Sequence, residues 1–505
     1  MAQEKFKTRG GFILACVGAA VGLGDSLRFP GLCAKYGGGA FLLIYFLGMM
    51  LIGIPLLNAE IALGRKFRAG APKCMAGLNK KAEPLGWASC FNSLVVAVLY
   101  AGILGWIIVM LVKIAPLCQA STSMTHSEVG GYFFNEVLGE NFSPTAFICI
   151  LAAWLIMYLF LRGGASSLAK TAKFTVLIPI ALLTLLAGRG LMYADSGKAL
   201  YALFVPDFSA FGNAELWLNA VGQVFFSLSV LVGIMPAYGA YLPEKTNVFR
   251  DSAIIAFTDF FVSVLSSVAL FTTLYGCGLQ GEIFRSGIAI AFMVYPAAIT
   301  VVFGAGNTVL NSVAGVLFYL SLAMMAAQSS VSMIEAAANP VSEKFSLNKK
   351  KTAGVMCAVG AAVSVVFATP TGPVALDIAD HFANYFNILI LGIFECMILG
   401  VCAKKINLAG EINLYTRKFR MPEKPFIFSL KYLSPAALTC LTLWGFYHLF
   451  VVEGGIYGGY PLWAQLVFGW AVSISVFASG FLILGISEVK KKRIPKLRKI
   501  KPRAR

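Results

Sequence analysis

The sequence predicts an all-α polytopic membrane protein with about twelve transmembrane helices, arranged as an inverted repeat of helices 1–5 and 6–10. Hydrophobic residues make up 58% of the 505 residues and charged residues only 13%, whereas soluble proteins carry about 25% charged residues. Apolar runs long enough to cross a hydrocarbon core about 30 Å thick recur along the chain. Two of them, at corresponding places in the two halves, are interrupted by glycines and polar side chains. Such interruptions are typical of inverted-repeat membrane proteins in which helices 1 and 6 are unwound at the midplane.

The apolar runs extend from Phe12 to Ile486. We expect spans centred near Val21, Leu51, Leu99, Leu151, Leu177, Phe225, Leu265, Phe318, Val359, Leu389, Leu441 and Ala471. The stretch from Ile288 to Val302 is shorter and contains Pro296, so it predicts a re-entrant or capping hairpin outside the main bundle. The first run continues into an Arg-Phe-Pro turn without a small-residue cleavage site, which argues against a cleavable signal peptide.

These runs divide the chain into seven predicted segments. They are a cytoplasmic N-terminal segment (1–10), a first five-helix repeat (11–187), an outer loop (188–212), a second five-helix repeat (213–403), a cytoplasmic loop (404–428), helices 11 and 12 (429–486) and a basic cytoplasmic tail (487–505).

The net charge of +18 is distributed unevenly along the chain. Basic residues cluster in Lys5–Arg9, Arg65–Lys81, Arg162–Lys173, Lys344–Lys351, Lys404–Lys424 and Lys490–Arg505. Residues 114–161, 368–380 and 453–461 contain neither Lys nor Arg. The two kinds of segment alternate, so the positive-inside rule places both termini in the cytoplasm, for a protein of the plasma (inner) membrane. This orientation accounts for the basic residues without nucleic acid as a partner, and the basic tail is expected to contact the lipid surface.

The eleven cysteines and three histidines indicate no metal or redox chemistry. Most cysteines lie in predicted spans, and no pair has zinc-finger or Cys-x-x-Cys spacing. No Ser/His/Asp set or metal cluster shares a span either. We therefore expect neither an enzyme nor an organic cofactor.

The first interrupted span reads Gly18-Ala-Ala-Val-Gly-Leu-Gly-Asp-Ser-Leu-Arg-Phe-Pro30. Unpaired backbone groups within a bilayer cost several kcal/mol each, so such a sequence is expected where the backbone lines a cavity. A helix interrupted at Gly22–Asp25 would present free amides and free carbonyls side by side, which suit an anion and a cation. A glycine packing seam would account for Gly18 and Gly22, but not for Asp25 or Arg28.

The second interrupted span, Gly222–Gly233, carries Gln223, Ser227 and Ser229 among apolar residues. It begins the second half of the chain as the first interrupted span begins the first half. The matching positions favour a binding site at the interface of two repeats.

These segments resemble the neurotransmitter:sodium symporter family. The resemblance rests on Gly18–Pro30, Gly37–Phe41, Gly53–Leu56, Glu60–Arg65, Gly222–Ser229 and the pair Ser329-Ser330. It runs from about Arg9 to about Ile486, and the short loop Pro116–Ser143 is similar to that of prokaryotic amino-acid members. The resemblance implies twelve helices, a substrate site at the bilayer midplane, two sodium sites and alternating access. The lipid bilayer and a small-molecule substrate are the expected partners, and the pattern indicates no oligomeric state.

Carried over by position, the resemblance implies a substrate site. The amides of Leu23 and Gly24 and the hydroxyl of Tyr100 would hold a substrate carboxylate. The substrate amine would meet the carbonyls of Ala20, Phe226 and Ser227, and its side chain would rest on Val96, Phe226, Ser229, Leu231, Val232, Ser329 and Met333. Members that carry amines without a carboxylate have an acid where this sequence has Gly22. Leu231 stands where glycine is usual. A small or medium neutral amino acid is the expected substrate.

The implied ion sites depart from the family pattern. The first sodium site would contain Ala20, Asp25, Ser227 and Asp259, with Asp25 and Asp259 in place of asparagines. Three carboxylates, counting the substrate's, cannot all remain charged cheaply around one monovalent ion. The alternatives are a proton at the site, a cationic substrate and a divalent ion; we favour the proton, then the cationic substrate. The second sodium site would contain Gly18, Val21, Met325, Gln328 and Ser329, where the Gln328 amide could ligate sodium or place its nitrogen in the ion's position.

The gates also follow from the resemblance. Arg28 and Asp380 would close over Phe226 on the outer side. On the inner side, Arg9, Tyr241 and Glu343 occupy gate positions, while Gln3 and Phe6 replace the usual arginine and tryptophan. The alternative is that these charged residues lie at the membrane interface and extend toward the headgroups. This explanation suits Lys5 and Lys7, but it suits Arg28 and Asp380 less well.

The resemblance also bears on chloride. Tyr45, Gln223, Ser227 and Ser263 stand where chloride-dependent members hold the anion. Asp259 precedes Ser263 by one helical turn and would repel chloride. We therefore predict an importer of a neutral amino acid, coupled to sodium and to protons, that does not require chloride. The alternatives are a carrier of a cationic amine or amino-acid derivative, a downhill exchanger, and a nutrient sensor that binds without transport.

Overall fold

The structure is a computed structural model that describes residues 5–243, 245–279, 281, 287–304, 306–416 and 420–485. Gln3 and the basic tail 487–505 lie outside the described residues. The described chain is helical almost throughout, and its two breaks, at residues 21–23 and 228–233, lie within the two interrupted spans.

The first half of the chain forms one broken span followed by long helices. Its elements are α1 (Arg9–Ala20), a π-helical turn (Gly24–Arg28), α2 (Phe29–Lys35), α3 (Gly39–Gly48), α4 (Ile54–Phe67), α5 (Ala71–Leu78), α6 (Glu83–Ala120), α7 (His126–Tyr132), α8 (Pro144–Leu161), α9 (Gly164–Leu191) and α10 (Ser196–Phe204). A π-helical turn at Met49–Gly53 joins α3 and α4 into one span.

The second half begins with the other broken span. Its elements are α11 (Ala214–Ser227), α12 (Ile234–Ala240), α13 (Val248–Gly276), α14 (Gly287–Ala289), α15 (Tyr295–Ile299), α16 (Thr308–Phe345), α17 (Lys349–Val363), α18 (Gly372–Asp380), α19 (Ile388–Cys402), α20 (Leu408–Ile412), α21 (Glu423–Phe428), α22 (Ser434–Tyr447), α23 (Leu462–Gln465) and α24 (Ala471–Gly485). A π-helical turn at His381–Asn387 joins α18 and α19.

The number of spans agrees with the predicted fold class. Ten described helical runs are long and apolar enough to cross a membrane, and the pair Arg9–Ala20 and Gly24–Lys35, bent by 53°, makes an eleventh. The halves α11 and α12 have only 14 and 7 residues, so each is too short to cross by itself. Counted as one broken span, they bring the total to twelve. The all-α polytopic fold is confirmed.

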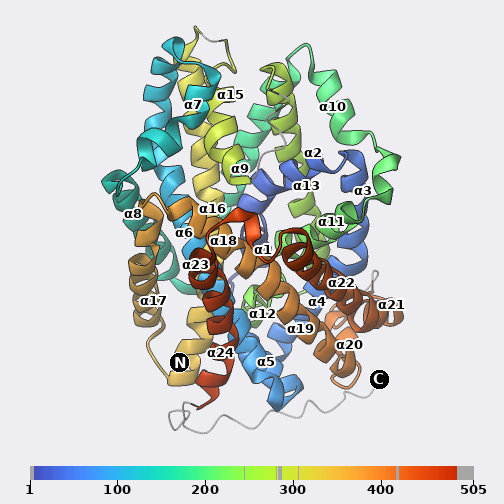
Figure 1. Cartoon of the computed structure of the whole chain (residues 1–505). Coiled ribbons are helices and arrows are strands. Elements are labelled where there is room, and N and C mark those ends of the chain that lie inside the picture. Colours follow the sequence, from blue (N-terminus) through green and yellow to red (C-terminus); the bar gives the residue numbers. More distant parts are fainter. Residues whose placement is uncertain are drawn as a thin grey trace.

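Helices α1 and α12 lie in the middle of the bundle and pack against the 38-residue helix α16, whereas α11 packs against α3 (Figure 1). Helices α7 and α15 lie at one end of the molecule, and α5 and α20 at the other (Figure 1). The short apolar helix Ile290–Ile299 packs beside α7 and α16. It occupies the stretch predicted to form a capping hairpin.

The first break begins earlier than predicted. The helix stops at Ala20, and Gly24 and Asp25 already belong to the π-helical turn rather than to the break. The reason is local: the Gly22 N–H donates to Asp25 Oδ2 at 2.9 Å, so the carboxylate caps the outer half-helix and lets it start sooner.

The second break is held open by an unusual backbone. Ser229 and Leu231 have φ values of 50° and 68°, a region that non-glycine residues adopt at a cost. The Leu231 N–H donates to Glu60 Oε1 on α4 at 2.7 Å. Helix α12 then crosses α4 so closely that a Cβ on Gly64 would lie 2.0 Å from the Pro236 carbonyl oxygen. These contacts hold the inner half of the second broken span against the first repeat.

Candidate functional site

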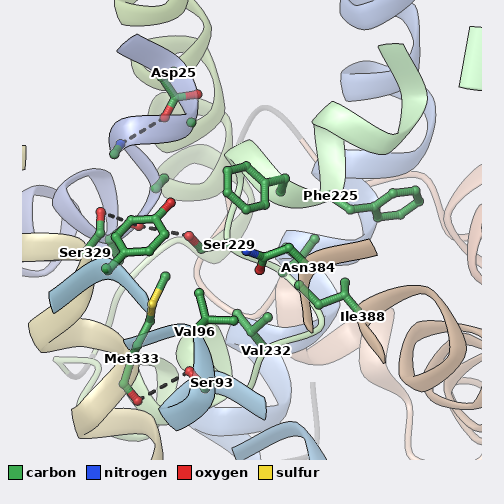
Figure 2. Close-up of a pocket in the computed structure, with 17 residues that line it drawn as sticks. Asp25, Ser93, Val96, Phe225, Ser229, Val232, Ser329, Met333, Asn384 and Ile388 are labelled. Carbon is green, nitrogen blue, oxygen red and sulfur yellow. Dashed lines mark hydrogen bonds between the residues drawn. The ribbon is translucent and has the colours of Figure 1, made fainter. Parts of the chain in front are cut away.

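A cavity lies between the two breaks and is closed by side chains of α6, α16 and the π-helical turn after α18 (Figure 2). Nine predicted pocket residues line it: Ala20, Gly24, Val96, Tyr100, Phe226, Ser229, Val232, Ser329 and Met333. Its free space is about 20 Å³, little more than one water molecule needs. Phe226 also lines an outer cavity of about 420 Å³. A solute larger than water therefore requires the Phe226 ring to move.

Three residues predicted for the pocket lie elsewhere. Leu23 lines the outer cavity, and the Ser227 hydroxyl bonds to carboxylates rather than facing the cavity. The Leu231 side chain packs on α19, where a Cβ on Gly392 would lie 2.4 Å from Leu231 Cδ1. The positive φ of Leu231 turns its side chain away from the cavity.

Residues that the sequence did not single out complete the lining. They are Ala19, Ser93, Phe225, Val230, Asn384 and Ile388. Figure 2 places Val96, Val232 and Ile388 together, away from Asp25. The cavity thus has an apolar end and an acidic end, which suits a solute with an apolar side chain and a polar head. The sequence could have indicated Ser93 and Asn384, because they are polar residues within predicted spans.

The polar end contains a hydroxyl free to bind a solute. Tyr100 is buried, yet its hydroxyl bonds to no protein group in the described part of the chain. At Gly24, a Cβ would lie 2.2 Å from Phe226 Cε1. The backbone amide of Gly24 can therefore be approached only because this residue has no side chain. The Ser229 hydroxyl is already used, since it donates to the Ala19 carbonyl at 2.8 Å.

The two aspartates of the predicted first ion site meet at one serine. Ser227 Oγ lies 2.5 Å from Asp25 Oδ1 and 2.5 Å from Asp259 Oδ2. Ser263 Oγ donates to Asp25 Oδ1 at 3.0 Å. Asp25 thus receives the Gly22 amide and two serine hydroxyls, whereas Asp259 Oδ1 is buried without a hydrogen-bond partner. Asp259 Oδ1 is therefore available to a cation here.

The predicted second ion site contains a glutamine carboxamide in a fixed position. Ser329 Oγ lies 3.4 Å from the Gly18 carbonyl oxygen and 3.5 Å from that of Val21. Gln328 Oε1 lies 3.3 and 3.1 Å from the hydroxyls of Thr171 and Thr175 on α9. Gln328 Nε2 is buried without a partner. Met325, also predicted here, contacts Ser26 Oγ through its sulfur at 3.3 Å.

On the outer side, the two predicted gate residues do not pair. Arg28 lies over the Phe226 ring, with its guanidinium carbon 5.2 Å from the ring centroid. Asp380 Oδ1 accepts from Asn384 Nδ2 at 2.6 Å. Among the described residues, no ion pair joins Arg28 to Asp380, and both line the outer cavity. The outer side is therefore open above Phe226.

The inner side is closed by partners that the sequence did not identify. Arg9 Nη2 lies 2.5 Å from Asp251 Oδ1 on α13, and the Tyr241 hydroxyl donates to Glu335 Oε1 on α16 at 2.6 Å. Glu335 also lies 2.6 Å from Lys349 Nζ, and Glu343 pairs with Lys73 at 2.5 Å. Phe6 is buried and packs edge-on against Phe12, Tyr238 and Tyr241. Arg9, Tyr241 and Glu343 thus share this end of the molecule but have different acidic or basic partners.

The acidic partners had a detectable signal, because Asp251 and Glu335 lie in apolar helices. Intramembrane acids are costly unless they are paired or functional.

Three comparisons place this geometry among known proteins. The model of the "Sodium:neurotransmitter symporter family" matches residues 3–127 and 136–488. An uncharacterized sodium-dependent transporter, MJ1319 of Methanocaldococcus jannaschii, is 30% identical over 97% of this chain and 99% of its own. The sodium-dependent neutral amino acid transporter B(0)AT3 of Mus musculus is 27% identical over 78% of this chain and 76% of its own. The crystal structure of MhsT in complex with L-phenylalanine matches with a TM-score of 0.76 and 23% identity, over 88% of this chain and 100% of that chain.

Proposed function

Because this chain belongs to the sodium:neurotransmitter symporter family, we propose that it imports a small or medium neutral amino acid by alternating access, coupled to sodium and to one proton, which sodium displaces from Asp25 and Asp259. The family consists of sodium-coupled membrane transporters rather than enzymes. The observation that carries the proposal is the cavity between the two breaks, which is lined by Tyr100 and by Asp25, one of the two carboxylates that share Ser227.

A neutral amino acid fits the two ends of the cavity. The amide of Gly24 and the hydroxyl of Tyr100 would take the substrate carboxylate, and Val96, Val232 and Ile388 would contact its side chain. At Gly22, a Cβ would lie 2.8 Å from Ser329 Oγ, so there is no room for an acid that could pair with an amine. Relatives named for neutral amino acids and a similar structure that holds L-phenylalanine support this substrate class.

The number of hydrogens available at Ser227 supports a proton at the first ion site. Oxygen–oxygen contacts of 2.5 Å require a hydrogen between the atoms, and this length is typical of a hydroxyl bonded to a carboxylate. The Ser227 hydroxyl has one hydrogen, but two such contacts reach it. In this proposal, a carboxyl group supplies the second hydrogen. Asp259 is the better candidate, because Asp25 also accepts from Gly22 and Ser263 and so favours the ionised form.

The same two carboxylates favour one alternative substrate. A cationic amine or amino-acid derivative could supply positive charge where the substrate carboxylate would otherwise add a third negative group. A neutral amino acid and a cationic one differ in the charge they carry across the membrane, so one transport experiment separates them.

Chloride is not needed in this proposal. Two of the predicted chloride-binding hydroxyls, those of Ser227 and Ser263, donate hydrogen bonds to Asp25 Oδ1. The carboxylate of Asp25 therefore occupies the donors that an anion would use. Asp259 adds a second acid on the same face of α13, one turn from Ser263.

We further propose that the second ion site is impaired. The Gln328 carboxamide is anchored by Thr171 and Thr175, and a Cβ on Gly18 would lie 2.6 Å from Gln328 Cγ. The side chain thus fills space beside the carbonyls of α1, and its unpartnered Nε2 can take the place of a cation there. One sodium ion at the first site is then the coupling ion.

The orientation follows from the charges. The closed end, which carries Arg9, Lys73 and Lys349, is proposed to face the cytoplasm of the plasma (inner) membrane, and the open cavity above Phe226 to face outward. Both termini are then cytoplasmic. Import begins when solute enters from the outer cavity and Phe226 turns to admit it.

The test is uptake by reconstituted protein. Proteoliposomes would be given a panel of labelled neutral and cationic amino acids, with sodium and proton gradients imposed independently. The proposal expects uptake of a neutral amino acid driven by sodium and sensitive to pH. Binding without uptake or counterflow would identify a sensor, and uptake restricted to cationic solutes would favour the alternative substrate. Counterflow with no response to either gradient would identify a downhill exchanger.

A further inference from the structure

A groove of about 1100 Å³ opens on the surface of α13 at the end of the molecule that carries Arg9. Arg250, Ile254, Phe257 and Phe261 lie along it at intervals of three and four residues, so they share one face of α13. Lys245, Arg9 and Tyr415 complete the basic end of the groove. The groove is separate from the solute cavity and from both predicted ion sites.

The groove changes from charged to apolar along the helix. Lys245 and Arg250 are exposed, whereas Ile254, Phe257 and Phe261 expose 36%, 43% and 57% of their surface. From Arg250 to Phe261 the helix rises about 16 Å at 1.5 Å per residue. That distance matches about half the thickness of a hydrocarbon core of about 30 Å. The apolar side chains therefore extend over the depth of one lipid leaflet.

The charged end suits an anion. Arg9 is neutralised by Asp251, which does not line the groove. None of the described residues that line the groove is acidic. Lys245 and Arg250 form no ion pair within the described part of the chain. The N-terminus of the 29-residue helix α13 also points to this end, and its dipole favours negative charge.

We propose that this groove binds an anionic phospholipid, with the headgroup phosphate on Arg250 and Lys245 and an acyl chain along Ile254, Phe257 and Phe261. Basic pockets at the cytoplasmic membrane interface select anionic headgroups in this way. Because Arg9 begins α1 and borders the groove, the bound headgroup lies beside the contact that closes the inner end of the first broken span.

The test is lipid binding to the purified full-length protein in detergent, measured by native mass spectrometry with phosphatidylglycerol and with phosphatidylcholine. The double variant Lys245→Gln/Arg250→Gln is compared with Arg162→Gln/Lys170→Gln, which removes two exposed basic residues near the α8–α9 turn. Each basic residue near an anionic surface contributes roughly fivefold in binding, so the groove variant is expected to bind phosphatidylglycerol about 25-fold more weakly. The control variant should bind as the wild type does, and phosphatidylcholine binding should be equal in all three.

Three results would overturn the proposal. They are equal phosphatidylglycerol binding by the wild type and the groove variant, an equal loss in the control variant, or binding of phosphatidylcholine as tight as that of phosphatidylglycerol. Inorganic phosphate separates a lipid site from a phosphate site, because it lacks the acyl chain and should not displace the lipid. A Phe261→Ser variant should weaken lipid binding while the charges remain. Unchanged lipid binding by that variant would count against the acyl contact.

Discussion

Replacing Asp259 by Asn tests the shared proton directly. In the wild type, Ser227 Oγ makes two 2.5 Å contacts with Asp25 and Asp259 but has one hydrogen to give. In Asp259→Asn, the amide Nδ2 supplies the missing hydrogen to Ser227, and Ser227 donates to Asp25. The variant therefore needs no bound proton, whereas the wild type holds one until sodium arrives.

The magnitude follows from linkage between sodium and the proton. If sodium binding expels one proton, the dissociation constant for sodium changes tenfold per pH unit while the site is protonated, or about 1.4 kcal/mol per unit. The sign is fixed: the proton competes with sodium, so lowering the pH weakens sodium binding by the wild type. The variant should show no such slope. At alkaline pH, however, the variant has one carboxylate fewer beside the ion and should bind sodium more weakly, by about 1 to 4 kcal/mol for charges about 4 Å apart.

The assay is a sodium titration of the purified protein at fixed substrate, repeated from about pH 5 to about pH 9. Asp25→Asn should reduce the slope as Asp259→Asn does. Asp207→Asn is the control: the Ser209 hydroxyl and amide hold the pKa of Asp207 below its usual range, so Asp207 stays ionised throughout and contributes no slope. A flat wild-type profile, or the same slope in the wild type and Asp259→Asn, would refute the shared proton.

Three further predictions address the other parts of the site. Tyr100→Phe should weaken amino-acid binding roughly tenfold to a hundredfold, as expected for the loss of a hydrogen bond to a charged group. Gly24→Val should abolish binding, because a side chain at Gly24 meets Phe226. Wild-type affinity of both variants in a binding assay would show that Tyr100 and Gly24 are not part of the site. The double variant Asp25→Asn/Asp259→Asn, which removes both carboxylates beside Ser227 and Ser263, should create a chloride requirement. The measurement is uptake in chloride against gluconate, and strong chloride stimulation of the wild type would contradict this. If the Gln328 carboxamide fills the second ion site, Gln328→Ser should raise the Hill coefficient for sodium by about one. An unchanged coefficient would show that this site already binds sodium or cannot be restored.

Long apolar runs made the fold predictable, since only helices can satisfy every backbone group within a bilayer. The two broken spans were predictable for the same reason, because Gly18–Pro30 and Gly222–Gly233 are unsuited to a continuous helix. The exact place of the first break was not. It depends on the hydrogen bond from Gly22 to Asp25, and the glycine pattern by itself suits a break on either side of Gly22.

Contacts between distant segments could not be predicted from the sequence. Arg9 and Asp251 are 242 residues apart, and Leu231 and Glu60 are 171 apart. Each of the two acids stood out as a charge in an apolar helix, which indicates a partner but not which one. The sequence therefore predicted Arg9, Tyr241 and Glu343 at the inner gate, while the acids Asp251 and Glu335 were identified only in the structure.

Leu231 shows why the residues of a binding site are harder to predict from a family resemblance than the membrane spans are. Leu231, at a position that usually holds glycine, was expected to contact the substrate side chain, but its positive φ turns the side chain away from the cavity. The side chain then fills space beside Gly392, and the amide is fixed by Glu60. The bulk of Leu231 therefore stabilises the second break without reducing the cavity. The apolar end of the cavity is bounded instead by Val96, Val232 and Ile388, and we expect these residues, rather than Leu231, to limit the size of the substrate side chain.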